Sequence, residues 1–154
     1  MIPLIIELPE SKAICFEGFS PDSEIKAFNK MSEWLNLTKL EKHYRILGHN
    51  IDTQGNLSYD PQNAGYKILL VIDNYNIDLI DLKTEIIKPG KFLVTRTEGE
   101  IKNVGQWLME GWGKVNKTIL EENLKTKNSP RWFEEHIKTP NPDYVIVDLY
   151  LELE

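Results

Sequence analysis

Residues 131–153 read RWFEEHIKTPNPDYVIVDLYLEL, and this stretch decides the fold. Two short apolar and aromatic segments, 132–137 and 144–153, flank the turn sequence TPNPD, which predicts two strands joined by a turn. Side chains on a strand alternate between its two faces. The later segment therefore has one aliphatic face that is typical of a core, formed by Val145, Val147, Leu149, Leu151 and Leu153.

A long helical pattern at residues 101–124 precedes these two strands. Its apolar stripe contains Val104, Leu108, Val115 and Ile119. Before the helix, residues 86–88 and 91–97 look like one strand that is interrupted by the turn at Pro89 and Gly90. The second half of the chain is thus predicted to run strand, helix, strand, strand.

The first half of the chain repeats this order. Its predicted elements are a strand at 4–7 that continues past the Pro9 turn at 13–17, a helix at 23–40, and strands at 44–51 and 65–73. There is also a short sequence repeat, because Glu17 and Gly18 precede the first predicted helix as Glu98 and Gly99 precede the second. We therefore predict one domain, residues 1–154, with an α+β fold of two βαββ repeats at about 1–75 and 80–154.

The composition excludes several classes of protein. A chain of 154 residues, 41% hydrophobic and 27% charged, suits one globular domain. Its net charge of −6 disfavours direct binding to nucleic acid. The single cysteine excludes an intrachain disulfide, and the three histidines lack zinc-site spacing, so we expect neither a metal nor a cofactor. The N-terminus has no signal-peptide or membrane-span pattern, so we expect a cytoplasmic protein.

The two C-terminal strands also carry a candidate binding face. The second face of residues 144–153 is too aromatic for plain solvent and too polar for a dry core, since it holds Tyr144, Ile146, Asp148, Tyr150 and Glu152. In the preceding strand, Trp132, Glu134 and His136 share one face. A carboxylate near a Trp, beside a strand that bears Tyr, is a combination of residues typical of a cation-binding site. The alternative is an exposed Glu134 next to a Trp that only packs on a neighbouring strand.

Three further aromatic residues are candidates for lining a pocket. Tyr66 begins a predicted strand, and Trp107 and Trp112 lie on the second predicted helix. Five positions apart on a helix, these two side chains point about 140° apart. We therefore expect one of them to belong to the core and the other to face a cleft or solvent. Core packing is the alternative for all three residues.

Four stretches of the chain resemble the GyrI-like, or AraC-type, effector-binding domains. They are GYKILLVI (65–72), IIKPGKFLVTRTEGE (86–100), RWFEEH (131–136) and DYVIVDLYLEL (143–153). The family includes drug-binding domains of multidrug-responsive transcription activators and free-standing single-domain members. The resemblance implies a curved antiparallel sheet with two main helices and a ligand cleft.

The resemblance also implies specific ligand-binding residues. In this family a glutamate of the penultimate strand pairs with cationic ligands in an aromatic pocket, and its position falls on Glu134, with Glu135 on the other face of the strand. The other implied ligand-binding residues are Tyr144 and Tyr66, which match the family's motifs, and Trp132, Trp107 and His136, which extend the set.

We expect a small-molecule-binding domain that captures lipophilic, cationic compounds, without a DNA-binding module of its own. One alternative is a hydrolase that opens small strained electrophiles with the pocket glutamate. Another is a protein-interaction role, with gyrase or a regulator as partner, because the family includes a gyrase inhibitor. No set of nucleophile, base and orienting group is recognisable in the sequence, which favours binding over catalysis.

Overall fold

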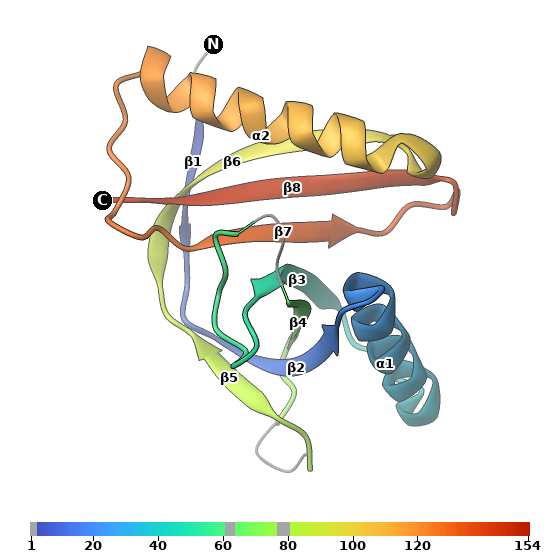
Figure 1. The fold of residues 1–154 in the computed structure, drawn as a ribbon. Helices are drawn as coiled ribbons and strands as arrows, with labels where there is room; N and C mark the ends of the chain where they lie inside the picture. Colours follow the sequence, from blue (N-terminus) through green and yellow to red (C-terminus); the bar gives the residue numbers. More distant parts are fainter. Residues whose placement is uncertain (1–2, 61–63, 77–80) are drawn as a thin grey trace. The chain divides into compact units, whose positions relative to one another are not determined.

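The structure, a computed structural model, describes residues 3–60, 64–76 and 81–154. The chain divides into two compact units (Figure 1). Residues Met1–Pro9 and Lys88–Glu154 form the first, here called the C-terminal unit. Residues Glu10–Ile87 form the second, here called the N-terminal unit. Each unit combines four strands with one main helix.

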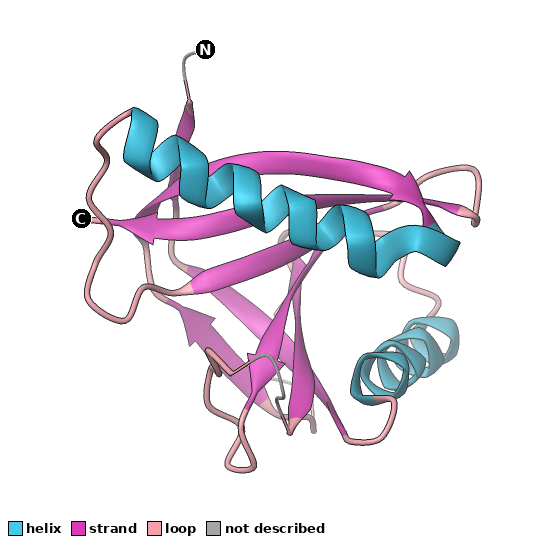
Figure 2. Cartoon of the chain, turned by 45° about the horizontal axis from the view of Figure 1, so that its top comes forward, coloured by secondary structure: helices cyan, strands magenta, loops and turns pink. Residues whose placement is uncertain are grey.

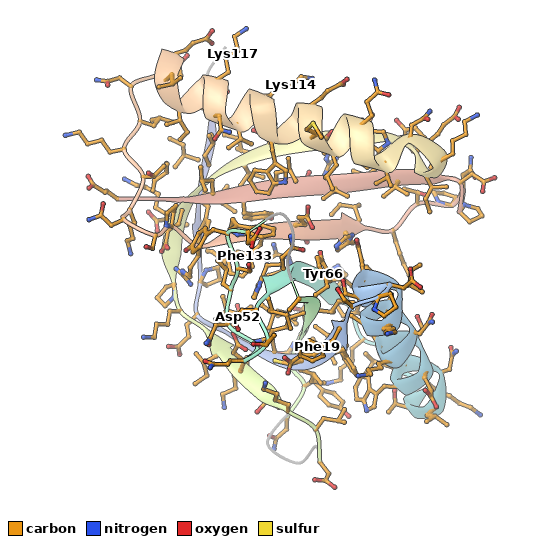
Figure 3. All side chains as sticks on the ribbon, viewed as in Figure 1. Phe19, Asp52, Tyr66, Lys114, Lys117 and Phe133 are labelled. Carbon is orange, nitrogen blue, oxygen red and sulfur yellow. The ribbon has the colours of Figure 1, made fainter. Side chains whose placement is uncertain are left out.

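The C-terminal unit is an antiparallel sheet with one helix on one face. Its strands follow the order β1 (Leu4–Leu8), β6 (Gly90–Glu100), β8 (Tyr144–Leu153) and β7 (Trp132–Ile137). A single 3-10 turn, η2 (Ile101–Asn103), leads from β6 into α2 (Val104–Glu121). Helix α2 runs along β6 and β8 (Figure 2), and Lys114 and Lys117 lie on its side away from the sheet (Figure 3).

The N-terminal unit has the same design. Its antiparallel strands follow the order β3 (Tyr44–Ile51), β4 (Gly65–Ile72), β2 (Ser11–Phe19) and β5 (Thr84–Ile87). Helix α1 (Ser23–Thr38) connects β2 to β3 and packs against β2 and β4. The α+β class and the two βαββ repeats predicted from the sequence are therefore confirmed.

The repeated Glu-Gly dipeptide before each helix is explained by helix packing. Gly18 pairs with Tyr66 on β4, and Gly99 pairs with Val145 on β8, each on the face that its own helix covers. A Cβ at Gly18 would lie 2.7 Å from the Ala27 backbone nitrogen of α1. A Cβ at Gly99 would lie 2.6 Å from the ring of Trp107 on α2. Both strands need glycine there because the following helix folds back directly onto the strand.

Two predicted strands are wrong in the same way. Residues 4–7 do not continue into 13–17, because β1 pairs with β6 whereas β2 pairs with β4 and β5. Likewise, residues 86–88 and 91–97 belong to separate strands, β5 and β6. Proline has no N–H to donate to a ladder, so pairing stops at Pro9 and Pro89 and the chain leaves one unit for the other.

Each unit buries its own apolar cluster beneath its helix. In the C-terminal unit Val115 of α2 packs with Leu93 and with Val147, Leu149 and Leu153 of β8. This confirms the aliphatic core face predicted for residues 144–153. In the N-terminal unit Ala27 and Met31 of α1 pack on strand residues that include Ile14, Phe16, Ile68 and Leu70.

No helix in the described ranges has both the length and the apolar character that crossing a membrane requires.

Candidate functional site

The sheet of the C-terminal unit has a second face, which points away from α2. Cross-strand partners share a face, so the pairing of Phe133 with Tyr150 and of Glu135 with Asp148 places all four side chains there. Phe92 joins them through its pairing with Glu152. We call Phe92, Phe133, Glu135 and Tyr150 the aromatic face of this unit; Figure 3 labels Phe133 on β7.

The three rings of the aromatic face form one contact cluster. The centroid of Phe92 lies 5.8 Å from that of Phe133 and 6.1 Å from that of Tyr150. These separations are typical of tilted and edge-on aromatic packing. None of the three rings is more than 5% exposed.

One carboxylate lies within this cluster. The hydroxyl of Tyr150 donates a hydrogen bond of 2.5 Å to Oε1 of Glu135, and Glu135 is only 8% exposed. A buried carboxylate needs a charged partner or hydrogen-bond donors. Glu135 has its donor in Tyr150, one of the three packed rings, and a carboxylate on the same face as aromatic rings is the chemistry that attracts an organic cation.

Two ion pairs flank the aromatic face. On one side the guanidinium of Arg96 donates to both carboxylate oxygens of Asp148, at 2.8 and 3.1 Å. On the other side Arg131 donates to Glu152 from its side chain and from its backbone N–H. The guanidinium carbon of Arg131 also lies 5.2 Å from the centroid of the Phe92 ring.

The Arg131–Glu152 pair ties three segments together. Nη1 of Arg131 donates to the Lys88 carbonyl and Nη2 to the Pro89 carbonyl, so one side chain holds the start of β6 against the end of β8. Burial alone would raise the pKa of Glu152. The hydrogen bonds and charge of Arg131, with a further contribution from Lys127, lower that pKa to about 2 instead.

Glu134, Trp132 and His136 lie on the other face of β7. Glu134 pairs with Leu149, so it points to the side of the sheet that α2 covers, and it is 6% exposed. The ring of Trp132 packs edge-on against Trp112 of α2, with centroids 5.6 Å apart. Burial lowers the pKa of His136 to about 4. These three predicted residues thus share one face of β7, on the side of the sheet against which α2 packs.

Tyr144 does not join Glu134. It lies on the same face of β8 as Tyr150, is 36% exposed, and its hydroxyl is hydrogen-bonded to Glu98. The two residues that match the family's motifs in the C-terminal unit are therefore on opposite faces of one sheet.

Tyr66 is buried in the core, whereas Trp107 lies half-buried against the apolar cluster of the C-terminal unit. Tyr66 lies on the face of β4 that α1 covers, is 2% exposed, and its ring fills the space above Gly48 (Figure 3). Trp107 packs over Gly99, and its indole N–H donates to the Glu100 carbonyl at 3.0 Å.

Trp112 packs on the same apolar cluster as Trp107, and both side chains are half-buried. The reason is the close approach of α2 at Gly111, where a Cβ would lie 3.0 Å from Leu149 and from Thr97. A helix this close to the sheet lets the residues on both flanks of its stripe reach the core.

The N-terminal unit carries a separate polar set on the face away from α1. Lys67 pairs with Glu85 at 3.0 Å, and the thiol of Cys15 points to the same carboxylate. Burial and the charge of Glu85 raise the pKa of Cys15 to about 12, so this thiol is unreactive at neutral pH. Within the described ranges, no three His, Cys, Asp or Glu side chains are grouped so that they could hold a metal ion.

Two residues of this region are not among the ligand-binding residues that the sequence predicts: Tyr150, which it places on the candidate face, and Arg96. Glu135 is predicted only as the alternative to Glu134. The mixed polar and aromatic face of residues 144–153 is the sequence feature that points to Tyr150. The missing information was the register between β7 and β8, which decides whether Glu134 or Glu135 shares that face.

Comparison with known proteins places the fold. No protein-family model matches the chain, and no curated protein is similar to it in sequence. Among solved structures, the EcmrR C-terminal domain superposes with a TM-score of 0.70 at 11% identity, over 99% of this chain and 97% of that one. The same TM-score is found at 10% identity for EcmrR in a complex with DNA, of which this chain spans 57%.

A third structure is SAV2435 bound to tetraphenylphosphonium. It aligns with a TM-score of 0.60 at 12% identity, over 100% of this chain and 94% of that one. Likeness at such low identity demonstrates a shared fold. The chain thus has the fold that its resemblance to GyrI-like effector-binding domains implies.

Proposed function

We propose that this chain is a small-molecule-binding domain that captures lipophilic cations on the aromatic face of its C-terminal unit. The observation that carries the proposal is Glu135, a buried carboxylate hydrogen-bonded to Tyr150, whose ring packs with that of Phe92 in the aromatic cluster. The rings would bind the apolar body of the ligand, and Glu135 would form an ion pair with its positive charge.

The energetics favour a cation over a neutral compound of the same shape. Contact of a desolvated cation with an aromatic face contributes about 2 kcal/mol. A bound cation also compensates the cost of keeping a carboxylate away from water. Because the four side chains are at most 8% exposed, neighbouring side chains must move to admit a ligand. Association is therefore expected to be slower than for a preformed open site.

The similar structures support this ligand class. SAV2435 was solved with tetraphenylphosphonium, which is an aromatic, lipophilic cation. EcmrR was solved on DNA, but this chain spans 57% of that protein. Transcriptional regulation, and a protein partner such as gyrase or a regulator, are therefore further proposals for this chain.

Glu134 is the competing anchor, as expected from the sequence, together with Trp132 and His136 under α2. Glu134 pairs with Leu149 across the strands, whereas Glu135 accepts a hydrogen bond from the phenol of Tyr150 and shares a face with three packed rings. We therefore place the anchor at Glu135. Tyr144, at the exposed end of the same face, would contribute to the entrance of the site.

A thermal-shift experiment tests the proposal with a matched pair of variants. Wild type, Glu135→Gln and Glu134→Gln are melted with tetraphenylphosphonium and with neutral triphenylphosphine oxide. We expect the cation to raise the melting temperature of wild type and Glu134→Gln but not that of Glu135→Gln. If only Glu134→Gln loses the shift, the anchor lies under α2; if no protein shifts with any cation, the proposed function is wrong.

A hydrolase acting on small strained electrophiles is the second candidate function. The short hydrogen bond between Tyr150 and Glu135 favours it, because a carboxylate next to a phenol can act as a base beside an acid. Incubation with a strained epoxide, followed by mass spectrometry, tests it. Diol formation by wild type that is lost in Glu135→Gln would establish turnover.

A further inference from the structure

The row of charges beside the aromatic face contains more than the proposed anchor. Arg96 on β6, Asp148 on β8 and Glu135 on β7 are directly paired across three neighbouring strands and lie on one face. Two carboxylates therefore share a row with one guanidinium. Arg96 is close enough to Glu135 for the charge of Glu135 to add to the stabilisation of its cationic form.

Arg96 is held by the middle residue of this row. Its Nε donates to Oδ1 of Asp148 at 2.8 Å and its Nη2 donates to Oδ2 at 3.1 Å. This is the bidentate geometry that arginine and carboxylate prefer. Asp148 is well buried, with 14% of its side chain exposed, whereas 57% of the Arg96 side chain is exposed. The carboxylate is thus the fixed member of the pair, and the guanidinium is the member with room to move.

Without Asp148, Arg96 would have two acidic neighbours whose charges stabilise its cationic form, Glu98 on its own strand and Glu135 on β7. Glu98 is already hydrogen-bonded to the Tyr144 hydroxyl, whereas Glu135 belongs to the aromatic face. Two strand spacings separate Arg96 from Glu135, about 10 Å between backbones, and an extended arginine side chain can span most of this distance. A guanidinium that reached Glu135 would occupy it as an internal cation and would compete with any cationic ligand.

We propose that Asp148 is a positioning residue that keeps Arg96 away from Glu135 and so leaves the aromatic face selective for external cations. This inference rests on the proposed function, and it assigns selectivity to a pair that does not itself contact the ligand. Arg96 would otherwise compete with a cationic ligand for Glu135, and its ion pair with Asp148 prevents this.

A double-mutant cycle tests the proposal by calorimetric titration with tetraphenylphosphonium. Asp148→Asn should weaken binding about tenfold, within the range of coupling energies for residues in contact. Addition of Arg96→Gln should restore the affinity to near the wild-type value, because the competitor is then absent. Arg96→Gln alone should bind the cation at least as tightly as wild type.

Two readouts separate this role from a merely structural one. Binding of neutral triphenylphosphine oxide should be unchanged in Asp148→Asn, whereas general damage to the site would weaken both compounds. If Asp148→Asn and the double variant are equally weak for the cation, Asp148 attracts the ligand directly and the inference is wrong. Weaker cation binding by Arg96→Gln alone would also overturn it, even if Asp148→Asn did not fold.

The same titrations distinguish this inference from the proposed function. Binding by wild type that is lost in Glu135→Gln supports the function, whatever the cycle shows. Strictly additive effects in the cycle overturn only the role of Asp148, whereas no binding by wild type overturns both claims.

Discussion

Glu134 and Glu135 are neighbours in the sequence, yet their side chains lie in different environments. Glu135 accepts a hydrogen bond from Tyr150 on the aromatic face, while Glu134 pairs with Leu149 beneath α2. The sequence RWFEEH alternates equally well in either register, so it predicts a buried glutamate but not which one. Only the pairing of β7 with β8 decides this, and that pairing depends on contacts between distant parts of the chain.

Glu152 provides a test of electrostatics at the scale of one residue. Its pKa is lowered from 4.5 to about 2 in the folded protein. A carboxyl group with a lowered pKa stabilises the fold at pH values above its unfolded pKa, and this contribution is lost as the pH falls toward the folded pKa. Glu152→Gln should therefore lower the free energy of unfolding at pH 7, by about 1–3 kcal/mol.

Urea unfolding of wild type and Glu152→Gln at several pH values measures this effect. The difference between the two proteins should be constant from pH 7 to 5 and should shrink between about pH 4.5 and 2. A difference that persists unchanged at pH 2 would mean that packing, and not charge, accounts for the role of Glu152.

At the scale of the elements, the helices and most strands were predictable because each has a local pattern. Leu108, Val115 and Ile119 of the predicted α2 stripe and the aliphatic face of β8 belong to one apolar cluster in the structure. Strand pairing was harder to predict, because nothing local to residues 4–8 indicates pairing with β6, more than 80 positions away in sequence. The repeated Glu-Gly dipeptide did indicate a tertiary contact, since both glycines lie under a helix.

The glycine under α2 allows a matched prediction. Gly99→Ala should destabilise the protein by about 1–3 kcal/mol, because its Cβ would lie 2.6 Å from the Trp107 ring and something must shift. Gly105→Ala is the control, since Gly105 lies within α2 with no atom within 4 Å of the added Cβ. It should stabilise the protein by about 0.5–1 kcal/mol.

Denaturant unfolding followed by tryptophan fluorescence measures both variants. Gly99→Ala should also change the emission of the native state, because Trp107 has to move. If the two substitutions had the same effect on stability, close packing of α2 on β6 would not be the reason for the glycine.

At the scale of the whole molecule, the exchange of end strands is the feature that the sequence did not reveal. Strand β1 contributes to the sheet of the C-terminal unit, although the chain then continues into the N-terminal unit. Leu8 of β1 is 2% exposed, whereas Leu4 of the same strand is 60% exposed. Both units therefore depend on segments that lie outside a simple division of the chain into halves.

The two leucines test the contribution of β1 to stability. Leu8→Ala should lower the free energy of unfolding by about 2–4 kcal/mol, and Leu4→Ala should change it by less than about 0.5 kcal/mol. Urea unfolding in a Trp34→Phe background reports on the C-terminal unit, because the remaining tryptophans, Trp107, Trp112 and Trp132, all belong to it. Equal effects of the two substitutions would contradict the placement of β1.

The central claim is that Glu135 on the aromatic face recognises the charge of a lipophilic cation. The most direct test is calorimetric titration of wild type and Glu135→Gln with tetraphenylphosphonium and with triphenylphosphine oxide. We predict that Glu135→Gln weakens binding of the cation by tenfold or more, about 1.4 kcal/mol, and leaves the affinity for the neutral compound unchanged. An unchanged ratio of the two affinities in Glu135→Gln would contradict the account.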